Sequence, residues 1–450
     1  MENMNLTDHF IDGLFSLSST TFSEKSLKQA KKCLLDYLGV TLAGSTIIKE
    51  KGNRLLNDLG SPTGDATVIG YDRKTNLQTA VICNGISSHV AELDDGHRYG
   101  MMHPGAPIIS ALLSVVEVHK LTQTDLLQGI IVGYETALGL ASQMQPDLKE
   151  RGLHGTAICG TIGAAAAIAS ALSFSKPQMK DAISAAAISA WGLLSAIEDG
   201  SELKPYNVGQ AAHKGLIAAY MARAGFTGPE DVFSGPYGFL SIVTGNPELA
   251  PITIRDEPKL IEQVYFKPYA ACRHCHAPID AALKINSLHN IRYEDIKLIE
   301  VKTYQGAVRR HDHTDIINIP SAKMSIPYSV AIALFSGKAG ISEFSNEHIQ
   351  NPAISQLAQK VKVQADQELS SLVPGLRPAI LKITTQDDQA YQVRIDLPKG
   401  EPENPLSIKE LEQKFFSHAI YGGRSLSQAE AIVRSIWSDE EDLSGLFNLI

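Results

Sequence analysis

Apolar residues recur at helical spacing through roughly the first half of the chain. In residues 23–42, Ala30, Leu34 and Tyr37 share one helical face, and Ser23 is placed to cap the helix. The same pattern predicts further helices over residues 79–91, 106–119, 126–144, 156–172, 176–194 and 208–224, the last followed by Gly225 as a C-cap. This part of the chain is therefore expected to be all helical.

These segments are rich in Ala and Gly on several faces, which is typical of helices packed closely inside a large core. Only short strand-like pieces interrupt them, such as residues 66–69. The chain shows neither a βαβ alternation nor a G-x-G-x-x-G motif after a strand, so a nucleotide-binding Rossmann domain is disfavoured.

The pattern changes near Pro251. Residues 296–304, 379–385 and 389–397 alternate between apolar and polar positions as half-buried strands do. Helices are expected between them at residues 278–287 and 326–334, and after them at residues 408–416 and 427–436. The fold class predicted is mainly α with an inserted α+β domain: a large all-helical domain of residues 1–263 and 399–450, and a smaller α+β domain of residues 264–398.

Composition bounds the class of protein. A chain of 450 residues with 44% hydrophobic residues can fill two cores, and its net charge is −9. Lys and Arg are scattered, so no nucleic-acid partner is expected. The longest apolar stretch, residues 160–174, is too short to span a membrane, and the N-terminal residues lack a secretory pattern. Five cysteines at irregular spacing then favour reduced thiols and a cytoplasmic location.

Residues 89–105 form the first chemical cluster. Its carboxylates are Glu92, Asp94 and Asp95, and its histidines include His103, which stands before Pro-Gly. The functional interpretation is an acid–base histidine oriented by a carboxylate, since histidine titrates near neutral pH. The alternative is a solvated connector in which Asp95 only caps a helix.

Two further motifs lead into predicted helices. His154 lies in Arg-Gly-Leu-His-Gly-Thr-Ala, and Lys204 precedes Pro205. Because a residue before proline is usually extended, Lys204 is expected at a helix entrance, where it would join the helix dipole in attracting an anion. The alternatives are a capping or core histidine and a solvated surface lysine.

Residues 265–280 contain Cys272-Arg-His-Cys275-His276, a C-x-x-C-H spacing. Covalent haem attachment is rejected because nothing in the sequence indicates export. Zinc is a stronger rival, although no second ligand pair lies nearby to close a tetrahedral site. Arg273 could instead bind a carboxylate with two parallel hydrogen bonds. Residues 309–313 and 321–328 add further cations and hydroxyl groups.

In this order the motifs resemble the MmgE/PrpD family, which includes 2-methylcitrate dehydratase, cis-aconitate decarboxylase and iminodisuccinate epimerase. The matching elements are the acidic turn running into His103-Pro-Gly, Gly-Leu-His154-Gly-Thr-Ala, Leu-Lys204-Pro, Cys-Arg273 leading to His276-Ala-Pro, and Ala-Lys323-Met-Ser-Ile-Pro-Tyr328. The resemblance implies a helical domain with a smaller α+β lid, an active site between them and a homodimer. It implies no metal and no organic cofactor.

The resemblance also implies the reaction and the residues that carry it. The expected enzyme abstracts a proton α to a carboxylate of a small di- or tricarboxylate, and fixed cations, including protonated histidines, stabilise the enolate-like intermediate. The residues expected to be catalytic are Asp94, Asp95, His103, His154 and Lys204. Those expected to bind the substrate are Glu92, Arg273, His276, Lys323 and Tyr328.

Two departures from the family pattern bear on the reaction. Dehydratases and decarboxylases of the family usually carry Asp-Phe-Asp-Asp-Thr, where this chain has Glu92-Leu-Asp-Asp-Gly96. Decarboxylases also place a tyrosine where this chain reads Arg-His-Asp-His. Both departures count against a decarboxylase, and they fit a divergent member such as an epimerase or a lyase of another dicarboxylate. The predicted function is a 2-methylcitrate dehydratase-like lyase, with an epimerase of a dicarboxylate such as iminodisuccinate as the alternative. A cis-aconitate-type decarboxylase, a metal or haem protein, and a catalytically silent relative are further alternatives.

Overall fold

Helices of the computed structural model begin at the caps that the sequence carries. The structure describes residues 5–198, 201–246, 250–255 and 259–450. The hydroxyl of Ser23 accepts a hydrogen bond from the backbone N–H of Ser26 and starts α2 (Glu24–Ile47), as the sequence predicts. Gly225, with φ of 91°, follows the end of α10 (Lys204–Arg223), as a glycine after a helix does.

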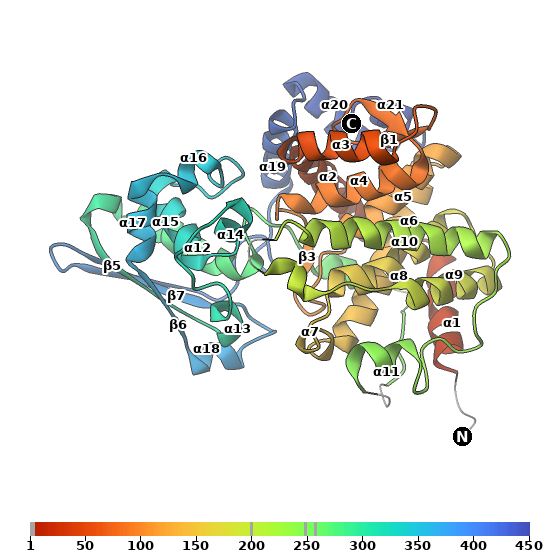
Figure 1. Ribbon diagram of the computed structural model, residues 1–450, viewed down its shortest axis with the longest axis horizontal. Helices are drawn as coiled ribbons and strands as arrows, with labels where there is room; N and C mark the ends of the chain where they lie inside the picture. The colour runs from red at the N-terminus through yellow and green to blue at the C-terminus, as the bar shows by residue number, and fades with distance from the viewer. Residues whose placement is uncertain (1–4, 199–200, 247–249, 256–258) are drawn as a thin grey trace. The chain divides into compact units, whose positions relative to one another are not determined.

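Backbone contacts divide the chain into two units (Figure 1). The helical unit comprises Met1–Ala196, Leu203–Val264 and Ser407–Ile450, and the α+β unit comprises Ile197–Glu202 and Tyr265–Leu406. The predicted fold class, mainly helical with a smaller α+β part, is confirmed. Residues 399–406, which the sequence analysis placed with the helical domain, lie in the α+β unit. There Gly400 accepts a hydrogen bond from the backbone N–H of Phe266 at 3.1 Å.

Helix α8 (Gly155–Ala171) is the centre of the helical unit, and every one of its residues is buried. It packs against four other helices. A Cβ added to Gly163 of α8 would lie 2.8 Å from the carbonyl oxygen of Gly133 on α6, so glycine is needed where these two helices touch. The four neighbours are α5 (Gly105–His119), α6 (Gln123–Met144), α9 (Lys176–Ser189) and α10.

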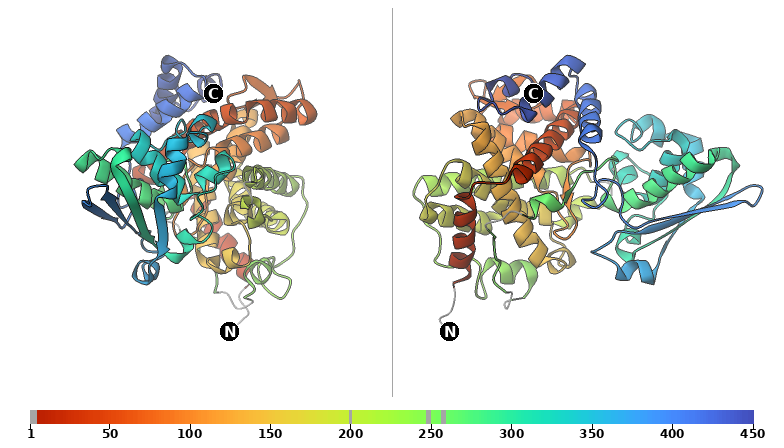
Figure 2. Two further views of the ribbon diagram at one scale, coloured as in Figure 1. Left: turned by 60° about the vertical axis from the view of Figure 1, so that its left-hand side comes forward. Right: turned by 180° about the vertical axis from the view of Figure 1, so that it is seen from behind.

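The C-terminal helices return to the N-terminal ones. Helix α19 (Ile408–Tyr421) and α20 (Leu426–Trp437) pack against α2, which Figure 2 shows from behind. The remaining helices of this unit are α1 (Leu6–Ser18), α3 (Lys49–Leu59), α4 (Leu77–Val90), α7 (Asp147–Glu150), α11 (Phe239–Thr244) and α21 (Ser444–Phe447). Its short strands are β1 (Ala66–Val68), β2 (Arg73–Thr75) and β3 (Gly96–His97), and β4 (Val264–Tyr265) crosses the unit boundary.

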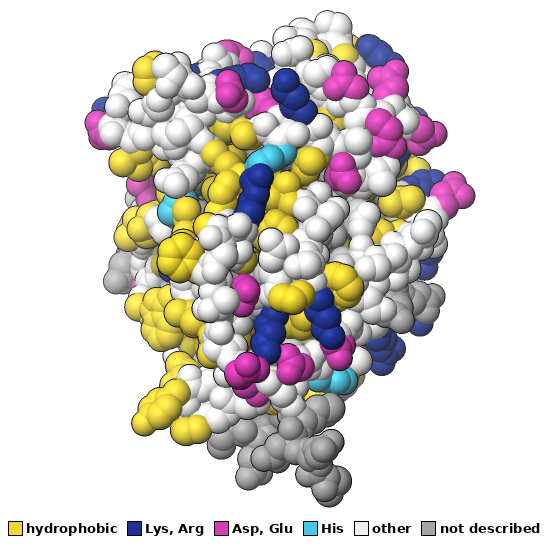
Figure 3. Space-filling model, turned by 90° about the vertical axis from the view of Figure 1, so that its right-hand side faces the viewer, with side chains coloured by type: hydrophobic (Ala, Val, Ile, Leu, Met, Phe, Trp, Pro, Cys, Tyr) yellow, Lys and Arg dark blue, Asp and Glu magenta, His cyan; other side chains and the backbone are white. Residues whose placement is uncertain are grey.

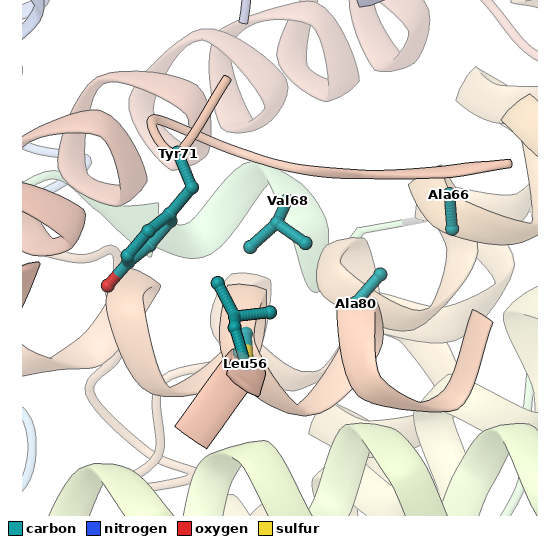
Figure 4. Close-up of a cluster of buried hydrophobic side chains, with 6 residues drawn as sticks. Leu56, Ala66, Val68, Tyr71 and Ala80 are labelled. Atoms are coloured by element: carbon teal, nitrogen blue, oxygen red, sulfur yellow. The ribbon is translucent and has the colours of Figure 1, made fainter. Parts of the chain in front are cut away.

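Strands β1 and β2 pair antiparallel and form a small hairpin. Its apolar side chains, Ala66 and Val68, pack with Leu56 of α3 and Ala80 of α4 in a buried cluster that also contains Tyr71 and Cys83 (Figure 4). The strand-like piece expected at residues 66–69 is therefore one strand of a two-stranded hairpin packed on α3 and α4, rather than part of a larger sheet.

The α+β unit is built on a four-stranded sheet in the order β6-β5-β7-β8. Strand β5 (Ile296–Thr303) pairs antiparallel with β7 (Ala379–Thr385), which pairs with β8 (Ala390–Ile395), as the alternating pattern predicts. Strand β6 (Val361–Ala365) was not predicted; it is a parallel edge strand with only its first residue buried. The helices of the α+β unit are α12 (His276–His289), α13 (Gln305–Val308), α14 (Ile319–Lys323), α15 (Ile326–Ser336), α16 (Asn346–Ile349), α17 (Pro352–Gln359) and α18 (Gln367–Ser371).

On the face that Figure 3 shows, hydrophobic side chains gather at the centre and left, acidic ones lie mostly towards the edges, and Lys and Arg occur singly or in small groups. The described helices include none that is both long and apolar enough to span a lipid bilayer.

Candidate active site

The acidic turn joins α4 to α5 and is buried, so the alternative of a solvated connector is wrong. Glu92, Asp94 and Asp95 are each at most 6% exposed. Glu92 has φ of 57°, a conformation that costs free energy for a residue with a side chain and is held only when the surroundings enforce it. Lys414 of α19 supplies part of that support, since its ammonium donates to the carbonyl oxygen of Leu93 at 2.8 Å.

Two histidines lie against the Asp94 carboxylate. Nδ1 of His89, at the end of α4, is 2.7 Å from Oδ2 of Asp94, and His89 is fully buried. Nδ1 of His103 is 2.5 Å from the backbone carbonyl oxygen of Asp95 and 3.7 Å from the same Asp94 oxygen. The His103 side chain is 15% exposed, so of the two it is the one that a substrate can reach.

Asp95 faces the start of α5. Its carboxyl group accepts hydrogen bonds from the Gly105 N–H at 3.0 Å and the Tyr134 hydroxyl at 2.7 Å. A Cβ at Gly105 would lie 2.6 Å from that hydroxyl, so glycine permits the contact. Burial, with the nearby carboxylates of Asp36 and Asp94, raises the pKa of Asp95 to about 8. Asp95 therefore does cap a helix, as the alternative interpretation proposed, but its carboxyl group is buried rather than solvated.

His154 immediately precedes α8, and its backbone N–H donates to the carbonyl of Gly192 at 3.0 Å. Its ring centroid lies 6.4 Å from that of His89. Burial lowers the pKa of His154 well below its usual value, and the positive charge of Lys204 lowers it further. His154 is therefore neutral at neutral pH, which differs from the expectation that protonated histidines supply cations.

Lys204 is the first residue of α10 and forms an ion pair with Glu92. The two side chains are 12% and 8% exposed. The expectation of an extended backbone at Lys204 is wrong, because Pro205 stands in the first helical turn, where its missing N–H costs nothing and the helix can begin one residue earlier. The alternative of a solvated surface lysine is wrong as well.

These contacts link six side chains of the helical unit into one group, which we call the acid–histidine cluster. Among the acidic and histidine residues predicted for the helical domain, Asp95 is the one whose side chain lies outside this group, because its carboxyl group binds Gly105 and Tyr134. His89, the first residue of the cluster at residues 89–105, was not singled out from the sequence; the signal was its position at a helix end beside an acidic turn. The members of the cluster are His89, Glu92, Asp94, His103, His154 and Lys204.

Two models of one protein family match this chain. The MmgE/PrpD N-terminal domain matches residues 12–252 and the MmgE/PrpD C-terminal domain matches residues 269–439. The chain belongs to the MmgE/PrpD family. This confirms the family that the motifs indicate.

Relatives of this MmgE/PrpD protein are named either as cis-aconitate decarboxylases or as 2-methylcitrate dehydratases. A cis-aconitate decarboxylase-like protein of Aspergillus oryzae is 28% identical over 99% of this chain and 97% of its own length. Human cis-aconitate decarboxylase is 25% identical over 99% of this chain and 94% of its own length. A probable 2-methylcitrate dehydratase of Saccharomyces cerevisiae is 24% identical over 58% of this chain and 54% of its own length.

In the α+β unit of this MmgE/PrpD protein, Arg273 and His276 bind one another. Nη2 of Arg273 lies 2.8 Å from the Glu401 carboxylate, and its Nη1 donates to Nδ1 of His276 at 2.9 Å and to the carbonyl of Lys399 at 3.2 Å. Nε2 of His276 then donates to the carbonyl of Ala271 at 3.1 Å. Both residues are at most 4% exposed, so their substrate-binding role stays a prediction.

Lys323 and Tyr328 lie at α14 and α15 of the same unit. Both are buried, and the hydroxyl of Tyr328 donates to the backbone carbonyl of Glu343 at 3.3 Å. The carbonyl of Lys323 accepts from the N–H of Cys272 at 2.9 Å. These contacts hold the unit together, and the predicted role of both side chains in substrate binding remains untested.

Within the described part of the chain, one group of histidine, cysteine or acidic residues could hold a metal ion, and it is not in the acid–histidine cluster. It consists of Cys272, His274 and His311, whose ligand atoms all lie within 4.8 Å of one another. Cys275 and His276, which the zinc hypothesis also named, are not part of it.

Proposed function

We propose that this protein is a lyase of a small di- or tricarboxylate, in which His103 transfers a proton at a carbon next to a carboxylate. The observation that carries the proposal is the contact of His103 with the Asp95 carbonyl and the Asp94 carboxylate, in the same cluster as Lys204. This is the arrangement that a general base needs: an oriented ring, and a carboxylate to stabilise the imidazolium that forms.

The cluster also favours an anionic ligand. Three helices begin beside it: α5 two residues after His103, α8 directly after His154, and α10 at Lys204. Each helix N-terminus carries a partial positive charge, and its first backbone N–H groups have no partner within the helix, an arrangement that stabilises anions. The Gly105 N–H of α5 already donates to Asp95. Together with the Lys204 ammonium, these helix N-termini would offset the charge of a polycarboxylate and of the enolate-like intermediate.

The proton steps follow from the tautomer of His103. A carbonyl oxygen only accepts hydrogen bonds, so Nδ1 carries a proton and Nε2 is the nitrogen that exchanges one with substrate. In a dehydration, Nε2 would remove the proton α to a carboxylate and the hydroxyl group would leave as water after protonation. In a decarboxylation, the C–C bond to the departing carbon dioxide would break, and the carbon left behind would take a proton from protonated Nε2. In an epimerisation, Nε2 would remove the proton of a carbon next to a carboxylate, and that carbon would take up a proton on its other face.

We keep dehydration of 2-methylcitrate as the reaction that the motifs favour, with cis-aconitate decarboxylation as the second candidate. A specific observation supports the second one: relatives named as decarboxylases match this chain over nearly their whole length, whereas the dehydratase named above matches over about half of its own, 54%. Epimerisation of a dicarboxylate such as iminodisuccinate is the further alternative.

The test is incubation of the purified protein with each of these three acids in deuterated buffer, followed by nuclear magnetic resonance of the products. Turnover of one acid, with deuterium incorporated at carbon, would support the proposal and identify the reaction. No turnover of any of the three and no deuterium at carbon would refute it. No added metal or organic cofactor should be required.

A homodimer, which the family resemblance implies, is also proposed. Large hydrophobic side chains are exposed on and near α9 and α10, among them Ile188 at 71%, Leu203 at 60% and Phe226 at 61%. Burying such side chains against a second copy would stabilise a dimer. Light scattering after size-exclusion chromatography should give twice the mass of one chain, and substitution of Ile188 by Lys should shift the mass towards that of one chain.

A further inference from the structure

The C-x-x-C-H motif separates into two groups in the α+β unit. Cys275 and His276 turn into the core: Cys275 is fully buried with its Sγ 4.0 Å from the Lys323 carbonyl, and the His276 ring lies between Arg273 and the Ala271 carbonyl. Cys272 and His274, in contrast, are partly exposed. The proposed reaction uses neither of them.

His311, which follows α13, completes the second group. The ring centroids of His274 and His311 are 4.8 Å apart, and the thiol of Cys272 and one nitrogen of each ring lie within 4.8 Å of one another. One ion with bonds of about 2.0–2.3 Å to nitrogen and sulfur would hold its ligands less than about 4 Å apart. Binding would therefore require the ligand atoms to approach one another by up to about 1 Å.

Nδ1 of each histidine ring, His274 and His311, already has a hydrogen-bond partner. Nδ1 of His311 donates to the backbone carbonyl of Arg309 at 3.0 Å, which places the lone pair on Nε2. Nδ1 of His274 lies 2.6 Å from the hydroxyl of Tyr304. The oxygen of this hydroxyl can accept the Nδ1 proton. Metal-binding histidines characteristically have such a partner on the second nitrogen, which fixes the tautomer and the ring orientation.

The backbones of Cys272 and His311 are both held by the segment that joins α14 to α15. The N–H of Cys272 donates to the carbonyl of Lys323 at 2.9 Å, and the carbonyl of His311 accepts from the N–H of Ile326 at 2.8 Å. Arg310, directly before His311, has φ of 77°, a strained conformation for a residue with a side chain. The junction between α14 and α15 therefore holds two groups that are far apart in sequence in position for a common ligand.

We propose that Cys272, His274 and His311 bind a zinc ion through one thiolate and two imidazoles. This set of sulfur and nitrogen ligands suits zinc and excludes magnesium and calcium, which require oxygen ligands. Three protein ligands leave the fourth tetrahedral position open to water or to an anion, as in zinc sites that bind a small molecule. The buried guanidinium of Arg377 interacts electrostatically with Cys272. It repels a cation, so the affinity should be lower than that of a closed structural site.

The experiment is titration of the reduced, metal-free full-length protein with Co²⁺, which replaces zinc and reports its ligands by absorption. One equivalent per chain should give a thiolate-to-cobalt charge-transfer band together with the intense visible bands of tetrahedral cobalt, and Zn²⁺ should abolish both. Cys272→Ser should remove the charge-transfer band. His311→Gln should weaken binding by about 10–100-fold or more.

Cys275→Ser is the matched control, because Cys275 belongs to the same motif and its thiol points to the Lys323 carbonyl. It should keep the band and the affinity, with circular dichroism confirming that every variant is folded. The wild-type protein alone can overturn the proposal, by showing no thiolate band at one equivalent of Co²⁺. A band that survives Cys272→Ser, or that Cys275→Ser removes, would overturn it as well.

Discussion

Nδ1 of His103 lies 2.5 Å from the backbone carbonyl oxygen of Asp95, while Oδ2 of Asp94 stands 3.7 Å from the same nitrogen. The carbonyl fixes the tautomer, and the carboxylate is close enough to stabilise a positive charge on the ring. The Asp95 carboxyl group instead accepts hydrogen bonds from the Gly105 N–H and the Tyr134 hydroxyl. The two neighbouring acids therefore act on His103 in different ways: Asp95 through its backbone carbonyl and Asp94 through its carboxylate.

Replacing His103 with Gln should lower kcat by about 10²–10⁴-fold on the substrate that the protein turns over, because the proton-transferring nitrogen is lost. Steady-state kinetics measures this, with circular dichroism to confirm folding. His9→Gln, which changes a histidine on α1 outside the cluster, should leave kcat unchanged. A His103→Gln variant with wild-type kcat would exclude His103 as the base.

Asp94→Asn should lower kcat by less than the loss of His103, on the order of 10–100-fold, since the ring stays held by the Asp95 carbonyl. The acidic limb of the pH–rate profile should move to lower pH because the imidazolium loses its nearest carboxylate. A profile that does not move while kcat falls would show that Asp94 acts by positioning His89 instead.

Glu92→Gln should lower KM several-fold for a polycarboxylate. In the structure the Glu92 carboxylate forms an ion pair with the Lys204 ammonium, so a substrate carboxylate would have to compete with Glu92 for that ammonium. Lys204→Met should raise KM, because the cation itself is removed. If Glu92→Gln raises KM instead, Glu92 contributes directly to substrate binding, as the sequence analysis expected.

Arg273→Leu should lower the free energy of unfolding by about 3–5 kcal/mol, because the carboxylate of Glu401 would be left buried without its partner. Chemical denaturation of the full-length protein measures this. Glu401→Gln combined with Arg273→Leu should recover part of the loss. A stable Arg273→Leu variant with a raised KM would instead support the predicted role of Arg273 in substrate binding.

Asp95 should make the protein less stable as pH rises. Its pKa is about 8 in the folded protein against an ordinary value of 3.8, so the folded state binds the proton more tightly than the unfolded state. The contribution of Asp95 to stability is then fully present below about pH 4 and is lost between about pH 4 and pH 8. Asp95→Asn should gain thermal stability over the wild type between about pH 5 and pH 8. Asp58→Asn, exposed on α3, should show no such gain.

Hydrophobic periodicity alone was enough to predict most elements of the fold, because a buried helical face or strand face repeats at a fixed spacing. It predicted the helices around α8 and the strands β5, β7 and β8. It missed β6, since an edge strand buries too few side chains to leave a pattern. It also placed the start of α10 too late, because the proline after Lys204 is as compatible with a first helical turn as with an extended residue.

The sequence by itself determined the family, the helical class and the motifs that hold the reactive side chains, because each depends on residue order. Only the tertiary structure decided which atoms meet. It directed the Asp95 carboxyl group to a helix start, paired Lys204 with Glu92 and saturated Arg273 with Glu401. It brought His311 to Cys272 as well. These pairings join residues from separate elements, and the packing of those elements sets burial and charge, which spacing along the chain does not encode.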